Sequence, residues 1–116
     1  MTEQKIYDLA TKLLAKTRSV TLTWESTPSG EAFLTSLAAF SVKVSRVWDE
    51  YGHESNVMLS ISGSDGRAVE SSVDNDLAEK LKLPAVVQTM GELYTEARRA
   101  ALGVDAALDQ LLAELD

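Results

Sequence analysis

The sequence contains no cysteine and a single histidine, His53. The absence of cysteine excludes disulfide frameworks, thiolate zinc sites, iron–sulfur clusters and cysteine nucleophiles. Metal sites with nitrogen ligands usually collect two or more histidines, which this chain cannot supply. We therefore expect no cofactor and no tightly held metal.

Long apolar runs are also missing near the start of the chain. The segment from Met1 to Leu14 carries charges every few positions, so it matches neither a signal peptide nor a membrane span. We expect a cytoplasmic protein that does not associate with membranes.

Basic residues are few, with 11 Lys and Arg against 18 Asp and Glu and a formal net charge of −7. This charge repels phosphate backbones at long range, and the sparse bases form no track for phosphates. The balance disfavours nucleic-acid binding and favours a basic or neutral protein partner, with a homodimer also open.

What the sequence does contain is enough apolar material for one core. At 116 residues and 45% hydrophobic content, the chain has the commonest size of a single domain. We expect one domain over residues 1–116.

The first half of the chain changes from helical to alternating periodicity. Apolar residues at helical spacing predict a helix over 2–17, begun by Thr2, and alternation over 20–25 predicts a strand. Residues 31–39 favour a short helix, because Phe33, Leu37 and Phe40 fit helical spacing. Alternation from Phe40 to Trp48 then predicts a second strand.

The second half predicts a hairpin followed by helices. Strands over 57–61 and 67–73 flank Gly63-Ser64-Asp65-Gly66, a turn whose glycines offer positive φ. Asp74-Asn75-Asp76 is expected to cap a short helix, and Pro84 to start a longer one that ends at Gly103. Asp105 is expected to cap a final helix.

This order of elements predicts an α+β fold. Strands that are followed by helices favour a four-stranded antiparallel sheet, with the N-terminal helix and two to three C-terminal helices packed on one face.

Candidate catalytic groups are sparse. His53 lies near Asp49, Glu50 and Glu54, but a solvated loop explains this cluster as well as a metal or general-base site does. Serines are plentiful, yet no nucleophile-elbow motif surrounds any of them. We expect a protein that is not an enzyme, although this stays open.

Two tryptophans fall in phase with apolar strand neighbours. We expect Trp24 and Trp48 to belong to the core between sheet and helices. The alternative is that they line a pocket or a binding face, which Arg46 on the same strand phase as Trp48 supports.

The last twelve residues combine an apolar stripe with acidic charge. Residues 105–116 carry four acids and no base, and Leu108, Leu111, Leu112 and Leu115 lie on one helical face. A helix this short needs a surface to dock on. The simpler expectation is docking on its own sheet; the alternative is binding to a groove of a basic partner protein.

Two groups of short segments stand out along the chain. The first is Leu13-Leu14-Ala15-Lys16-Thr17 with Leu22-Thr23-Trp24-Glu25, Thr27, Phe33 and Leu37; the second is Leu93-Tyr94, Ala97-Arg98-Arg99, Ala101-Leu102, Val104-Asp105 and Leu108-Asp109. With these segments the chain resembles a family of small bacterial proteins of unassigned function. The resemblance implies no activity and assigns no functional residues.

Three functions are compatible with these features. The first is a non-catalytic protein-binding module, such as an immunity protein, an inhibitor or an adapter. The second is a small acidic homodimeric chaperone for a secreted partner. The third is a small-molecule binder or enzyme with a pocket near Trp24 and Trp48.

Overall fold

The computed structural model describes residues 2–48, 52 and 54–116. Within them the chain forms four helices and five strands. In chain order these are α1 (Thr2–Arg18), β1 (Glu25–Ser26), β2 (Ala32–Leu37), β3 (Phe40–Trp48), β4 (Ser55–Gly63), β5 (Ala68–Val73), α2 (Asp74–Leu81), α3 (Ala85–Leu102) and α4 (Val104–Leu115).

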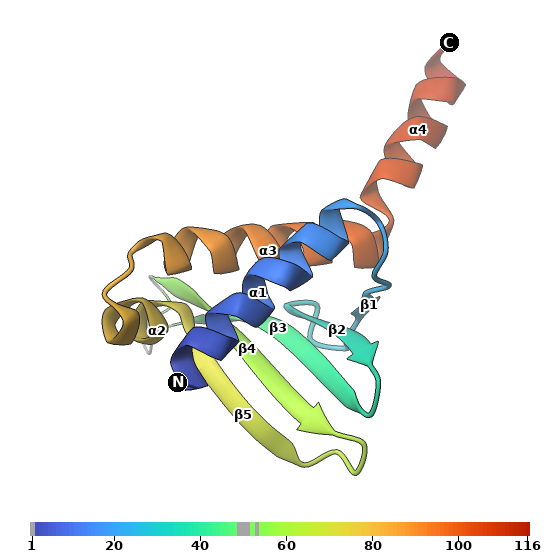
Figure 1. Ribbon diagram of the computed structural model, residues 1–116. Coiled ribbons are helices and arrows are strands. Elements are labelled where there is room, and N and C mark those ends of the chain that lie inside the picture. The colour runs from blue at the N-terminus through green and yellow to red at the C-terminus, as the bar shows by residue number, and fades with distance from the viewer. Residues whose placement is uncertain (1, 49–51, 53) are drawn as a thin grey trace.

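The strands form one antiparallel sheet in the order β1-β2-β3-β4-β5, so every strand pairs with its neighbours in the chain (Figure 1). In the centre of the sheet Val44 lies opposite both Phe33 and Leu59. All three side chains are buried and therefore mark the face that packs on the helices. The expected α+β class with an antiparallel sheet is confirmed, with five strands rather than four.

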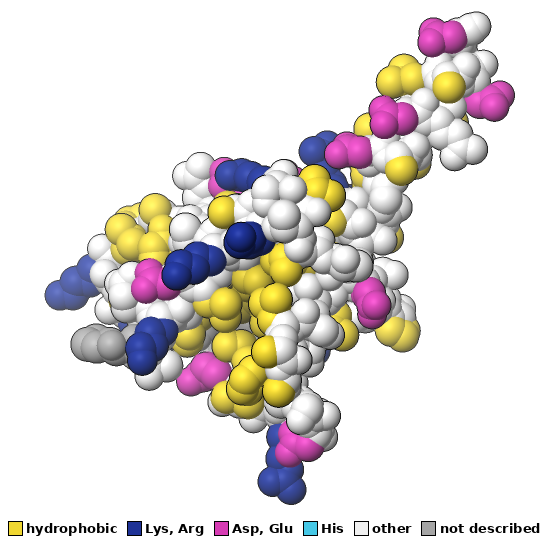
Figure 2. Space-filling view, turned by 45° about the vertical axis from the view of Figure 1, so that its right-hand side comes forward, with side chains coloured by type: hydrophobic (Ala, Val, Ile, Leu, Met, Phe, Trp, Pro, Cys, Tyr) yellow, Lys and Arg dark blue, Asp and Glu magenta, His cyan; other side chains and the backbone are white. Residues whose placement is uncertain are grey.

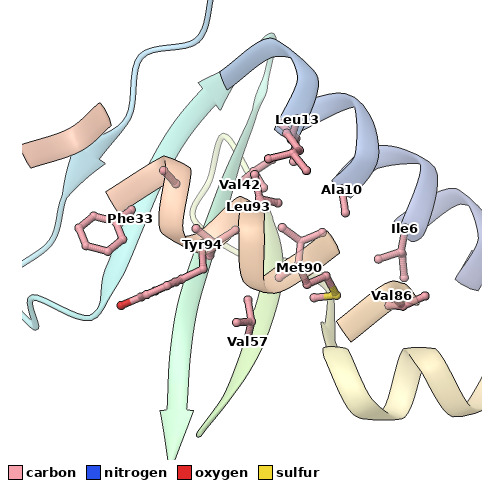
Figure 3. Packing of buried hydrophobic residues seen from close by; sticks show 14 of the residues in the cluster. Ile6, Ala10, Leu13, Phe33, Val42, Val57, Val86, Met90, Leu93 and Tyr94 are labelled. Atoms are coloured by element: carbon pink, nitrogen blue, oxygen red, sulfur yellow. The ribbon is translucent and has the colours of Figure 1, made fainter. Parts of the chain in front are cut away.

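Helices α1 and α3 cover that face of the sheet (Figure 1). Ile6, Ala10 and Leu13 of α1 point toward Met90 and Leu93 of α3, which lie above the sheet (Figure 3). The helical spacing of these residues places them on one face of each helix, as expected. Leu77 of α2 is buried in the same cluster, so the core is a single layer between the sheet and helices α1, α2 and α3.

The expected helix over 31–39 is wrong, because this segment forms β2. Phe33 and Thr35 are buried on the helix-facing side of the sheet, and Ala32–Leu37 pairs along its length with β3. Ala38 has a φ of 54°, which lets two residues turn the chain directly into β3. The spacing of Phe33 and Leu37 fits a helix as well as a strand. Pairing with β3 makes this segment a strand.

The expected strand over 20–25 is also wrong except for its last residue. After α1, the N–H groups of Val20 and Thr21 donate to the carbonyls of Thr17 and Lys16, so this segment completes the end of the helix. Val20 is 87% exposed and has a φ of 60°. Sheet pairing starts only at Glu25, where the strand was expected to end.

The remaining strands and the long helix follow the sequence pattern. Gly66 has a φ of 83° in the turn between β4 and β5, and Gly103 has a φ of 64° at the end of α3, both as expected. The helix starts differ by one or two residues: Thr2 lies within α1, and α2 and α4 begin after Val73 and Gly103. Asp74 and Asp105 occupy first turns instead of capping positions.

Candidate interaction surfaces

Helix α4 extends away from the rest of the domain and packs on neither face of the sheet (Figure 1). The positive φ of Gly103 ends α3 and sends the chain in a new direction. None of the residues of α4 is buried. The expectation that this helix docks on its own sheet is therefore wrong, and its apolar side is left uncovered by the described chain.

The leucine stripe of α4 consists of Leu108, Leu111, Leu112 and Leu115. Their exposed fractions are 49%, 60%, 62% and 84%. Single exposed leucines are common on protein surfaces, but four on one helical face form a contiguous apolar patch. Such a patch on a projecting helix is typical of a surface that another molecule covers.

Acidic side chains flank the leucine stripe on both sides. At helical spacing Asp105, Asp109 and Asp116 line the edge next to Leu112, and Glu114 lies beside Leu111 on the other edge. Figure 2 shows these acidic and apolar side chains together along the projecting helix. Because α4 contains no Lys or Arg, all the charged side chains on this helix are negative.

Arg46 and Trp48 form a second exposed feature at the end of β3. The Arg46 guanidinium carbon lies 5.7 Å from the centroid of the Trp48 ring and 5.0 Å from that of Tyr94 on α3. The Trp48 Nε1–H donates to both carboxylate oxygens of Glu31, at 3.1 and 3.3 Å. These contacts hold the arginine by cation–π attraction on two aromatic faces.

Trp24 does not belong to this feature. It is 4% exposed, and its Nε1–H donates to the Thr17 hydroxyl at 2.9 Å. Trp48 is 46% exposed. The expectation of a core residue is thus confirmed for Trp24 and wrong for Trp48, and the structure brings together Arg46 and Trp48 but leaves Trp24 apart.

Tyr94 and Glu31 are the members of this feature that the sequence did not indicate. Alternation along β3 placed Arg46 on the helix-facing side of the sheet, but no sequence signal identified which residue of α3 lies beneath it. Tyr94 also meets the buried Phe33 ring edge-on at a centroid distance of 5.6 Å. Because this contact holds Tyr94 in the core, its ring is a fixed surface on which the Arg46 guanidinium packs.

A hollow of about 500 Å³ lies beside Arg46 and Tyr94. Its other lining groups come mainly from α3 and include Glu92, Glu96 and, from the start of α2, Asp74. Asp74 is buried, and its Oδ1 accepts the N–H of Asn75 at 2.7 Å. The hollow is thus lined by three carboxylates and one guanidinium, a balance of charge that disfavours an anionic ligand.

No group of three or more histidine, aspartate or glutamate side chains that could hold a metal ion occurs within the described part of the chain. The candidate cluster of Asp49, Glu50 and His53 lies outside the described residues. No helix in the described ranges is long and apolar enough to cross a membrane.

Comparisons with known proteins find no match. No family model matches the chain, and neither a curated protein nor a solved structure is similar to it. The resemblance to small bacterial proteins therefore stays an expectation based on the sequence segments alone.

Proposed function

We propose that the protein is a non-catalytic protein-binding module whose docking element is α4. The observation that carries this proposal is the exposure of all four leucines of the stripe on a helix that projects from the folded domain. An amphipathic helix that lays its apolar side into a groove is an established mode of protein recognition.

The charge of α4 supports a partner with a basic rim around an apolar groove. Acids flank the leucine stripe on both edges, so a partner that covers the leucines brings its own rim against Asp105, Asp109 and Glu114. Pairing α4 with α4 of a second copy places like charges near one another, which disfavours this arrangement. A different, basic protein is therefore the proposed partner of α4. The experiment below distinguishes this partner from a second copy of the chain, which the homodimeric chaperone would require.

The test compares two glutamate substitutions on the same helix. Leu111→Glu introduces a charge within the leucine stripe, whereas Gln110→Glu adds the same charge away from the stripe. We expect both variants to melt at the wild-type temperature, because neither side chain is buried. Each protein is used as bait in lysate of the native host, and captured proteins are identified by mass spectrometry.

The expected result is one basic protein that the wild type and Gln110→Glu capture and Leu111→Glu loses. Binding of the purified partner should weaken as salt rises, because screening reduces the attraction between opposite charges. Equal capture by all three baits contradicts the proposal. Light scattering distinguishes the chaperone: a wild-type mass near twice 12.6 kDa that falls to 12.6 kDa for Leu111→Glu makes α4 a homodimer contact.

A further inference from the structure

Strand β5 has one unpaired edge. It is the last strand of the sheet, and among the residues that the structure describes it pairs only with β4. Ala68, Val69 and Ser71 along this strand are exposed, with Val69 at 60%. Proteins commonly protect such edges with lysine, proline or a bulge. β5 contains no lysine or proline, and the irregularity at Ile61 and Ser62 affects only its first residues.

The backbone of Ser71 faces this open edge. Glu70 and Ser72 lie opposite Ile61 and Leu59 of β4, and Ser71 is the residue between them. The N–H of Ser71 donates to the Oε1 of its own neighbour Glu70 at 3.0 Å, so a side chain and not a strand accepts this hydrogen bond. A carbonyl of an added strand is the natural replacement for that acceptor.

A hollow of about 280 Å³ adjoins the same edge. Residues 70–73 of β5 form one side of it, and the first turns of α1 and residues of α2 form the others. Ile6 and Leu77, both buried, contribute an apolar floor. Leu59 faces the helices, so Glu70 and Ser72 share the helix-facing side, and every second side chain of a strand added to β5 points toward this hollow.

The charges around the hollow determine which side chain of an added strand can bind there. Glu3, Glu70 and Asp76 line it together with a single base, Lys80, which leaves an excess of negative charge. An apolar floor under a negative rim suits a lysine or arginine, whose aliphatic stem packs on apolar surface while its charged end meets carboxylates.

We propose that the open edge of β5 binds an extended peptide segment as a sixth, antiparallel or parallel strand, with a lysine or arginine of that segment seated in the hollow beside Ile6 and Leu77. Strand addition at an open sheet edge combines backbone hydrogen bonds with pockets for alternate side chains. This site is independent of α4 and does not rest on the proposal made for that helix.

The test uses a synthetic probe, the capped peptide Val-Thr-Lys-Thr-Val, and the full-length protein labelled with nitrogen-15. Titration followed by amide chemical shifts should perturb Glu70, Ser71 and Ser72 of β5 most strongly. A peptide with glutamate in place of its lysine should bind at least ten-fold more weakly, because it meets like charges in the hollow.

Two protein variants distinguish backbone pairing at the edge of β5 from nonspecific binding of the peptide. Ser71→Pro removes the outward N–H but no hydrogen bond to β4, so the fold is retained while strand addition is blocked; Ser71→Ala is the matched control. We expect at least a ten-fold loss of peptide affinity for Ser71→Pro and none for Ser71→Ala.

Equal affinity of the proline and alanine variants overturns the proposal, as does equal binding of the lysine and glutamate peptides or shifts located away from β5. A dimeric wild type that Ser71→Pro converts to a monomer also overturns it, because the edge is then occupied by a second copy. Deleting α4 should leave peptide binding unchanged, so failure of this site and failure of the α4 proposal are distinguishable.

Discussion

At the scale of single residues, the buried pair of Thr17 and Trp24 joins α1 to the start of the sheet. The Thr17 hydroxyl accepts the indole N–H at 2.9 Å and donates to the Leu13 carbonyl at 2.6 Å. Both residues are buried, so neither the Thr17 hydroxyl nor the Trp24 indole N–H can form a hydrogen bond with water instead. A buried donor that loses its acceptor retains its full desolvation penalty.

Thr17→Val should therefore lower the free energy of unfolding by about 1 to 3 kcal/mol, because it leaves the Trp24 N–H without an acceptor. Thr11 is the matched control, since its hydroxyl makes the same type of bond to the Tyr7 carbonyl but is exposed. Thr11→Val should change the free energy by less than about 0.5 kcal/mol. Urea denaturation of both variants checks the difference; equal effects would show that burial of the pair is unimportant.

Gly66 allows a test of backbone strain alone. Its φ is 83°, and a Cβ added there meets no atom within 4 Å. Gly66→Val should destabilise the protein by about 1 to 3 kcal/mol through the disfavoured conformation of a β-branched residue. Gly66→Asn should be clearly milder, because asparagine tolerates positive φ. Thermal melts compare the two, and a valine variant that melts with the wild type would contradict the turn geometry.

At the scale of elements, α4 differs from α1 and α3 in what it contributes to the fold. The buried faces of α1 and α3 supply much of the hydrophobic core, whereas α4 supplies no buried side chain. Helices of this length are marginal in water by themselves. Its exposed leucines therefore contribute little to the stability of the domain.

A chain that ends after Gly103 should accordingly keep the melting temperature of the full-length protein. The control ends after Glu96 and removes Ala97, which is fully buried between the helices and the sheet. This shorter chain should melt at a clearly lower temperature, because it loses the last turns of α3 and their core contact. Differential scanning calorimetry distinguishes the two, and a large loss on removing α4 alone would mean that the helix docks on the domain.

At the scale of the whole molecule, stability rests on one core between the sheet and helices α1, α2 and α3, without disulfides. Charge is distributed unevenly: four of the acids and none of the bases lie in the last twelve residues, against a formal net charge of −7 for the chain. The rest of the domain is therefore closer to neutral, and the negative potential of the molecule is concentrated around α4.

We expect EDTA to leave the melting temperature unchanged. The described residues contain no cluster of three metal-ligating side chains, and the core cluster consists of hydrophobic side chains. Thermal melts with and without chelator check this. A fall of several degrees that one particular ion restores would contradict the expectation and direct attention to Asp49, Glu50 and His53.

The sequence alone determined those elements whose pattern has one interpretation. The apolar spacing of α1 and α3, the alternation from Phe40 to Trp48 and the glycines at 66 and 103 all predicted what the structure contains. These signals are local: they depend on helical or strand periodicity and on which residues tolerate positive φ.

Only the tertiary structure decided the segments whose local pattern is ambiguous and the placement of exposed groups. Residues 32–37 fit a helix or a strand, and pairing with β3 settled the matter. Trp24 and Trp48 share a pattern, yet one is buried over Thr17 and the other stacks with Arg46 at the surface. The leucine stripe was visible in the sequence, but a helical pattern shows only that one side is apolar. What covers that side depends on how the chain turns at Gly103, and this turn directs α4 away from its own sheet.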